Sequence, residues 1–158
     1  GQIMIESLGQ KRMKAAFQQC DEVENYCQGK LADTCSKFRT RLRDAPVFIH
    51  DAGLLQVLVF SMSKTELAYR FLAASLLRWA LGFSDGKLYD MILPGYVDSE
   101  AYGEELQEKL AEKNLEMFKG IMDKEPLQLL KITDECVAFL EWLKRFAEAR
   151  FKEEKEID

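Results

Sequence analysis

Apolar residues recur at helical spacing along almost the whole chain. Between residues 5 and 27, one side of a 3.6-residue wheel collects apolar and cysteine side chains, which predicts an amphipathic helix. Ser7 and Gln10 have the spacing of a capping box, and Gly29 is a suitable stop. Arg12 projects into the apolar arc of this helix. We expect its stem to pack and its head to reach water, unless it contacts a subunit or RNA.

A second helix is predicted from about Leu31 to Arg43, with a narrow apolar stripe between two basic rows. Lys37 and Arg41 share one flank of the stripe, and Arg39 and Arg43 share the other. Each row presents a charge about every 6 Å along the helix axis, a spacing that can follow a phosphate backbone. The alternative is an ordinary solvated face.

The next segments continue the helical pattern. Pro46 suits a first helical position. Residues 47–60 are so apolar that we expect them to form the central helix of the bundle. A buried strand would also fit the segment LLQVLVF. Ser63 and Glu66 have capping-box spacing and predict a helix that ends at Gly82. Residues 83–97 are irregular, and Leu88–Leu93 is either a short helical turn against the bundle or a docking loop.

The C-terminal third predicts two more helices. The first is capped near Asp98 or Ser99 and ends before Pro126. The second is capped by Thr133 and is largely buried. We therefore expect an all-α, compact bundle of about five to seven helices in a single domain over residues 1–158. Residues 1–4 are interpreted as a tag remnant or disordered start, and residues 152–158 as a frayed charged tail.

Composition narrows the class of protein. The 158 residues are 47% hydrophobic and 31% charged, which is typical of a globular protein. No apolar run approaches the ~18–20 residues of a membrane helix, and no apolar signal core is visible, so we expect a soluble cytoplasmic protein without a membrane partner. The net charge is −5, but residues 1–50 carry +2 and residues 91–158 carry −7. A local basic face on the N-terminal half is therefore possible on an acidic chain.

Residues for catalysis or metal binding are sparse. The four cysteines form no C-x-x-C pair, and we expect them to be free, small core residues. His50 is the only histidine, and its apolar neighbours predict burial. No Walker-type loop, G-x-S-x-G or H-E-x-x-H is present, so neither a metal site nor a cofactor is expected. The four cysteines mentioned above are Cys20, Cys27, Cys35 and Cys136.

The last predicted helix carries a recognisable motif, IT-x-E-x(4)-LEWLKRFAEAR, from Ile132 through Arg150. It resembles the small all-helical subunit of type III-B CRISPR RNA-targeting effector complexes, the Cmr module. Upstream similarities are GQKRMKAA, Ala45-Pro46 leading to Gly53-Leu54-Leu55, Phe60 and Lys64, and Leu76-Leu77-Arg78-Trp79. The chain departs from the family at Leu130-Lys131, where a Tyr-Arg pair is common, and over residues 83–125.

The resemblance implies a non-catalytic role in antiviral defence. Such subunits stack in a short filament and cradle the duplex of guide RNA and target RNA by its backbone. Their partners are the large subunit, the repeating backbone subunits, to which target cleavage is attributed, and further copies of themselves. Base pairing reads the target sequence, so the protein need only hold phosphates.

We therefore predict that a set of cations binds RNA phosphates. They are Arg12, Lys14, Lys37, Arg39, Arg41, Arg43, Lys64, Arg78, Lys144 and Arg145. Two alternatives remain. One is a protein adaptor that docks through strips such as Leu88–Leu93 and whose basic residues scatter around the bundle. The other is a hydrolase with paired carboxylates such as Glu104 and Glu108, which would need a cleft.

Overall fold

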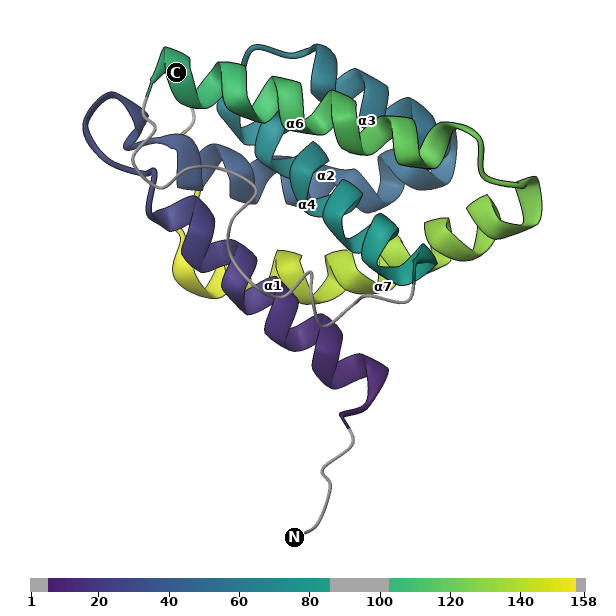
Figure 1. The fold of residues 1–158 in the computed structure, drawn as a ribbon. Helices are drawn as coiled ribbons and strands as arrows, with labels where there is room; N and C mark the ends of the chain where they lie inside the picture. The colour runs from purple at the N-terminus through teal and green to yellow at the C-terminus, as the bar shows by residue number, and fades with distance from the viewer. Residues whose placement is uncertain (1–5, 86–102, 156–158) are drawn as a thin grey trace, which may run out of the picture.

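The computed structural model describes residues 6–85 and 103–155, which form a bundle of α-helices (Figure 1). The helices are α1 (Leu8–Glu24), α2 (Thr34–Ala52), α3 (Leu54–Ser63), α4 (Leu67–Ser84), α6 (Glu104–Met122) and α7 (Pro126–Arg150), with a 3₁₀ turn η1 (Gly29–Leu31). The two described ranges contain no strand, which confirms the all-α prediction. Asp98, Ser99 and Leu88–Leu93 lie outside them.

Helix α4 is the central helix of the bundle. All its residues from Phe71 to Ala80 are buried, and it packs against α2, α3, α6 and α7. The prediction that residues 47–60 supply the central helix is wrong, because Val47 and Val59 are 65% and 48% exposed. This segment is divided between two helices that each bury only one side.

Helix α2 runs straight through Pro46, so the predicted boundary there is wrong. An interior proline costs about 3 kcal/mol because its ring clashes and one hydrogen bond is lost. Leu42, Ala45 and Ile49 nevertheless form one unbroken buried stripe across it. The break comes instead at Gly53, whose φ of 86° lies in a region that favours glycine.

One predicted capping box is present and the other is not. At the start of α1, the Gln10 amide donates to Ser7 Oγ (3.1 Å) and the Ser7 amide donates to Gln10 Oε1 (2.8 Å). Ser63 instead ends α3, and its hydroxyl donates to the Phe60 carbonyl. Glu66 precedes α4 with no side-chain cap. A capping spacing in the sequence is therefore insufficient when the first residue already belongs to another helix.

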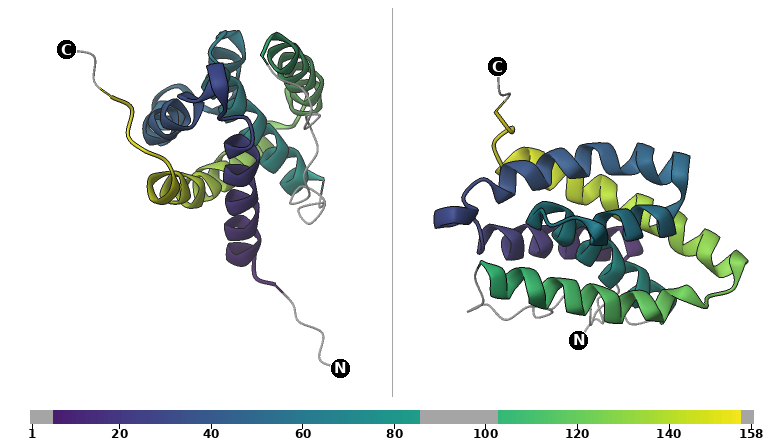
Figure 2. Two further views of the ribbon diagram at one scale, coloured as in Figure 1. Left: turned by 90° about the vertical axis from the view of Figure 1, so that its left-hand side faces the viewer. Right: turned by 90° about the horizontal axis from the view of Figure 1, so that it is seen from above.

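The last helix begins earlier than predicted. Helix α7 starts at Pro126, a favoured first position, and continues for 25 residues. Thr133 lies inside it, where its hydroxyl donates to the Leu129 carbonyl at 2.7 Å. Helix α7 lies beside α1, as the two views of Figure 2 also show. The end of α7 therefore reaches the end of α1, where Arg150 bonds Asp21.

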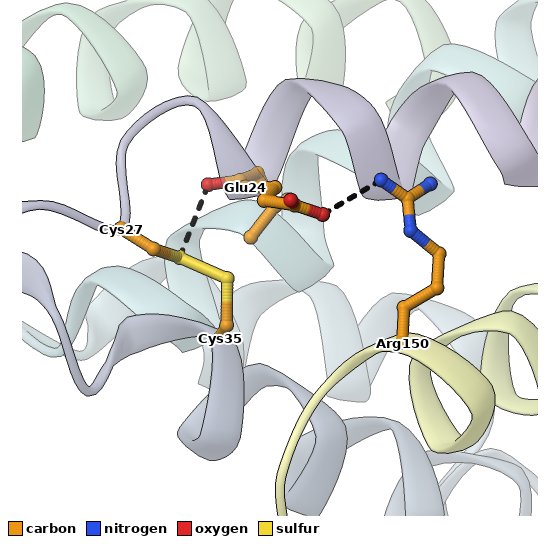
Figure 3. The surroundings of a disulfide bond; sticks show 5 residues. Glu24, Cys27, Cys35 and Arg150 are labelled. Carbon is orange, nitrogen blue, oxygen red and sulfur yellow. Dashed lines mark hydrogen bonds and ion pairs between the residues drawn. A yellow bond between two sulfur atoms is a disulfide. The ribbon is translucent and has the colours of Figure 1, made fainter.

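The cysteine prediction is half wrong. Cys27 and Cys35 form a disulfide that joins the segment after α1 to the first turn of α2 (Figure 3). Helix α1 ends at Glu24, so Cys27 leaves the apolar face on which the periodicity placed it. Cys20 and Cys136 are buried free thiols, as expected. Burial raises the pKa of the Cys20 thiol to about 12, so it stays protonated.

His50 is exposed rather than buried. Because α2 continues past Pro46, Ile49 faces the core and His50 points outward beside Asp51, 3.2 Å away. Within the described ranges, no helix is both long and apolar enough to cross a bilayer.

Candidate nucleic-acid interface

Five of the predicted cations lie on the two flanks of α2 or in the connection between α3 and α4, and this set is here called the α2 face. Its members are Lys37, Arg39, Arg41, Arg43 and Lys64. Their side chains range from one quarter exposed at Arg39 and Arg41 to two thirds exposed at Arg43. The helical spacing of the α2 members sets the two rows, as the sequence predicted.

The row of Lys37 and Arg41 continues onto aromatic side chains. Arg41 donates to both carboxylate oxygens of Glu66 at 2.8 to 3.2 Å, and its guanidinium lies 4.5 Å from the centre of the Tyr69 ring. The Tyr69 ring contacts the Phe60 ring, and the Lys64 ammonium lies 4.4 Å above that ring. Arg41 and Lys64 are therefore connected through two rings across α3 and α4.

Arg39 on the other row caps the end of α7. Its Nη1 donates to the backbone carbonyls of Glu148 (3.2 Å) and Phe151 (2.7 Å). Its Nη2 reaches Glu153 at 3.4 Å. A cation near the last carbonyls of a helix is stabilised by the helix dipole and by the unpaired carbonyls. Arg39 therefore joins α2 to α7 and still presents part of its guanidinium at the surface.

A groove runs between α2 and the segment that follows α7. Its lining mixes both charges: Arg39, Thr40, Arg43, Glu148, Glu153, Glu154 and Lys155. Lys144 lies one turn before Glu148 on α7, and residues four apart share a helix flank. Lys144 therefore belongs to the flank of α7 that borders this groove.

Arg12 and Arg78 instead pair with acids of other helices, Arg12 partly buried and Arg78 buried. Arg12 donates to both oxygens of the buried Glu135 on α7 at 2.5 and 2.7 Å, and Trp79 Nε1 donates to the same carboxylate at 3.1 Å. The carboxylate raises the pKa of Arg12. The Arg12 side chain is only 22% exposed and its guanidinium is paired, so this guanidinium is not open to a phosphate group.

Arg78 is buried between α4 and α1. It donates to Glu22 at 2.8 Å and to Gln19 at 3.1 Å, and its side chain is 10% exposed. Burial raises the pKa of Glu22, although Arg78 opposes the rise. The pair joins two helices, as the Arg12 pair does, and we leave both arginines out of the candidate interface.

Lys14 and Arg145 each pair with an acid close to them in the sequence. Lys14 on α1 pairs with Glu6 at 3.0 Å, and Arg145 on α7 pairs with Glu148 at 3.1 Å. Arg145 thus makes a local ion pair within its own helix. Both side chains are more than half exposed.

Acids partner most of these cations. Lys37 pairs with Asp33, which raises its pKa, and Arg43 pairs with Asp44. Of the ten cations, Lys64 and Lys144 make no ion pair with an acid of residues 6–85 or 103–155. Any polyanion at the α2 face must therefore replace carboxylates. Exposed ion pairs contribute only about 0–1 kcal/mol each, so replacement is feasible.

The sequence analysis missed an apolar groove between α1 and α7. It is lined by Met13, Lys14, Phe17, Gln18 and Phe146. Phe17 is 47% exposed and meets the Phe146 ring edge to face, and Trp142 stacks on the other side at 6.2 Å. The signal was available, because Phe17 and Phe146 both belong to predicted apolar arcs, but only the packing of α1 on α7 shows that they meet at the surface.

The carboxylates of the hydrolase alternative lie on an exposed face. Glu104 and Glu108 are both exposed on α6. Within the described residues, no group of three or more histidine, cysteine, aspartate or glutamate side chains has a geometry that could hold a metal ion.

Comparison with protein families gives the affiliation. The model of the family described as CRISPR-associated protein (Cas_Cmr5) matches residues 8–150, from the first residue of α1 to the last residue of α7. The chain belongs to the Cas_Cmr5 family. Membership implies a subunit of a CRISPR-associated Cmr complex, in agreement with the resemblance seen in the last helix.

Proposed function

We propose that this Cas_Cmr5 chain is a non-catalytic subunit that holds the backbone of the guide–target RNA duplex on its α2 face. The observation that carries the proposal is the set of cations on and beside α2, namely Lys37, Arg39, Arg41, Arg43 and Lys64, with Lys144 on the adjoining flank of α7. Phosphate contacts of this kind position a nucleic acid without reading its sequence.

The side chains suit a phosphate path. Arg43 and Lys37 are exposed enough to exchange their carboxylate partners, and Lys64 lies over an aromatic ring with its ammonium near the surface. Guanidinium groups donate to phosphate oxygens in pairs, whereas ammonium groups act as point charges. The α2 face offers both kinds. The bases would remain paired with each other and make no specific contact with this surface.

The same proposal includes assembly beside other subunits of the complex and stacking of copies of this chain. A second surface supports such contacts. Phe17 and Phe146 line an apolar groove, Trp142 stacks on Phe146, and apolar grooves on soluble proteins commonly mark interaction sites. This groove also favours the adaptor alternative, in which protein contacts alone define the role.

Binding to a fluorescein-labelled RNA duplex tests the proposal. The test variant is Lys37→Ala/Arg43→Ala/Lys64→Ala, which removes three charges from the α2 face. The matched control, Lys113→Ala/Lys119→Ala/Lys131→Ala, removes three charges from exposed positions on α6 and α7. Fluorescence anisotropy of the full chain is measured over a range of salt concentrations.

The test variant should bind at least about tenfold more weakly at low salt. Its slope of log affinity against log salt should fall by about 2–3, because each phosphate contact contributes about 0.7–0.9. Changing the RNA sequence should leave affinity unchanged. Equal losses in the test variant and the control would place RNA elsewhere, and no binding by the parent chain would favour the adaptor.

A further inference from the structure

The chain after α7 starts beside α2, where Arg39 contacts it. Arg39 Nη1 binds the Phe151 carbonyl at 2.7 Å, and two residues later Glu153 reaches Arg39 Nη2 at 3.4 Å. Glu154 lines the same groove as Arg39 and Arg43. Figure 2 shows this last yellow segment leaving the end of α7 near α2, on the opposite side of the bundle from α6, and then extending outward.

The two carboxylates act on several cations of the α2 face. The hydrogen bond to Asp33 is the largest cause of the raised pKa of Lys37, and the charge of Glu154 raises it further. Glu153 is paired directly with Arg39. Two carboxylates therefore line the groove beside the cations proposed to bind phosphate, together with Lys155.

We propose that Glu153 and Glu154 form an acidic strap that occupies the phosphate path of the free chain and is displaced when an RNA backbone binds. The inference rests on the proposed function, because it describes how the same α2 face is regulated. Carboxylate and phosphate oxygens compete for the same donors, since both accept charge-assisted hydrogen bonds from guanidinium.

The contact between the strap and Arg39 is weak and reversible. Nη1 of Arg39 already donates to two backbone carbonyls. Glu153 and a phosphate would therefore compete for Nη2. The Glu153 side chain is 83% exposed, so releasing it requires little rearrangement. The buried Phe151 keeps the strap close to the groove, which gives its carboxylates a high effective concentration.

The expected effect on affinity follows from the fraction of open chains. An apparent dissociation constant rises in inverse proportion to the binding-competent fraction. A strap that is closed in about three chains of four would weaken RNA binding about fourfold. Because the contact is electrostatic and exposed, salt should weaken the strap as well as the RNA contacts.

The test compares two charge-matched variants of the full chain. Glu153→Gln/Glu154→Gln neutralises the strap while retaining its length. Glu104→Gln/Glu108→Gln removes the same charge from the exposed face of α6. All three proteins are titrated against the same fluorescein-labelled RNA duplex, at low salt and near 0.5 M salt.

The strap variant should bind about three- to tenfold more tightly than the parent at low salt, and the control less than about twofold. The gain should shrink toward unity at high salt. Equal gains in both variants would reflect net charge alone and overturn the strap while leaving the proposed function intact. If no version of the chain binds the duplex, the strap and the proposed function both fail.

Discussion

Glu135 is the acid on which three helices converge, so its removal is the most informative perturbation of the fold. It lies on α7, is 6% exposed, and accepts hydrogen bonds from Arg12 of α1 and from Trp79 of α4. The substitution Glu135→Ala leaves a guanidinium without its counter-ion and a buried indole N–H without an acceptor.

The magnitude follows from these contacts. Breaking a buried ion pair by removing one partner costs about 3–5 kcal/mol. Leaving the buried Trp79 indole N–H without an acceptor costs about 1–3 kcal/mol, and this cost is already included in the 3–5 kcal/mol for the broken pair. Arg12 is 22% exposed, so water replaces some of its lost bonds. We therefore expect a loss of about 3 kcal/mol, or about 6–12 °C in Tm for a chain of this size.

The assay is urea unfolding followed by far-UV circular dichroism and by tryptophan fluorescence, to which Trp79 and Trp142 both contribute. Glu141→Ala, on the exposed face of the same helix, is the control and should stay within about 0.5 kcal/mol of the parent. The double variant Arg12→Met/Glu135→Gln removes both charges and keeps an acceptor for Trp79. It should recover most of the loss, because a buried ion pair and a well-packed neutral pair are often similar in stability.

A loss below about 1 kcal/mol in Glu135→Ala would mean that Arg12 and Trp79 find other partners, and the interior pair would then be incidental. A double variant as unstable as Glu135→Ala would place the cost in packing and not in the unpaired charge. Either result would also return Arg12 to the set of cations available for RNA.

Three further predictions concern local features of the fold. The variant Cys27→Ser/Cys35→Ser should lose about 2.5 kcal/mol of unfolding free energy in urea, as should the reduced parent, because the disulfide closes a loop with a sequence separation of 8. Gly53→Ala should cost about 1–3 kcal/mol in the same assay because φ is 86°, whereas Gly9→Ala in α1 should stabilise by about 0.5–1 kcal/mol. Burial raises the pKa of Glu22, so the folded chain holds this proton more tightly than the unfolded chain does. The parent should therefore lose stability relative to Glu22→Gln as pH rises from about 4.5 through the raised pKa. A difference in unfolding free energy that does not change with pH would contradict this.

The sequence predicted the fold class and several helix faces, because burial repeats with the helical period. It failed at boundaries that depend on neighbours. Pro46 did not interrupt α2, because Leu42 and Ile49 pack on one continuous stripe across it. Thr133 looked like a cap, but the turn before it packs as helix from Pro126 onward. Local propensities of about 1 kcal/mol, and the cost of about 3 kcal/mol for an interior proline, are outweighed here by tertiary burial.

The candidate site was predictable as a pattern but not as an electrostatic environment. The rows of α2 follow from spacing alone, and the structure retains them. The acids that pair with these cations could not be predicted from spacing, because Glu66 is 25 residues from Arg41 and Glu153 is 114 residues from Arg39. The disulfide was missed for a related reason, since Cys27 and Cys35 meet only because α1 ends early.

Residue type carries information that the sequence analysis did not use. Arginine more often than lysine ties separate elements together here: Arg12 reaches α7, Arg70 bonds the Gln107 carbonyl of α6, and Arg150 reaches α1. Lys37 and Lys109 instead pair with acids four residues away on their own helices or helix ends. A guanidinium loses less hydration on burial and offers a rigid fork of donors, so it suits contacts between helices.

This difference matters for the α2 face. Its arginines serve the fold and the proposed RNA contact at once, whereas Lys64 makes no ion pair with a described acid. Substituting Arg39 or Arg41 would therefore disturb helix contacts as well as any phosphate contact, and a loss of RNA binding would have two causes. Lys64→Ala removes a charge without breaking a tie between helices. It is the substitution whose effect on RNA affinity would report the surface alone.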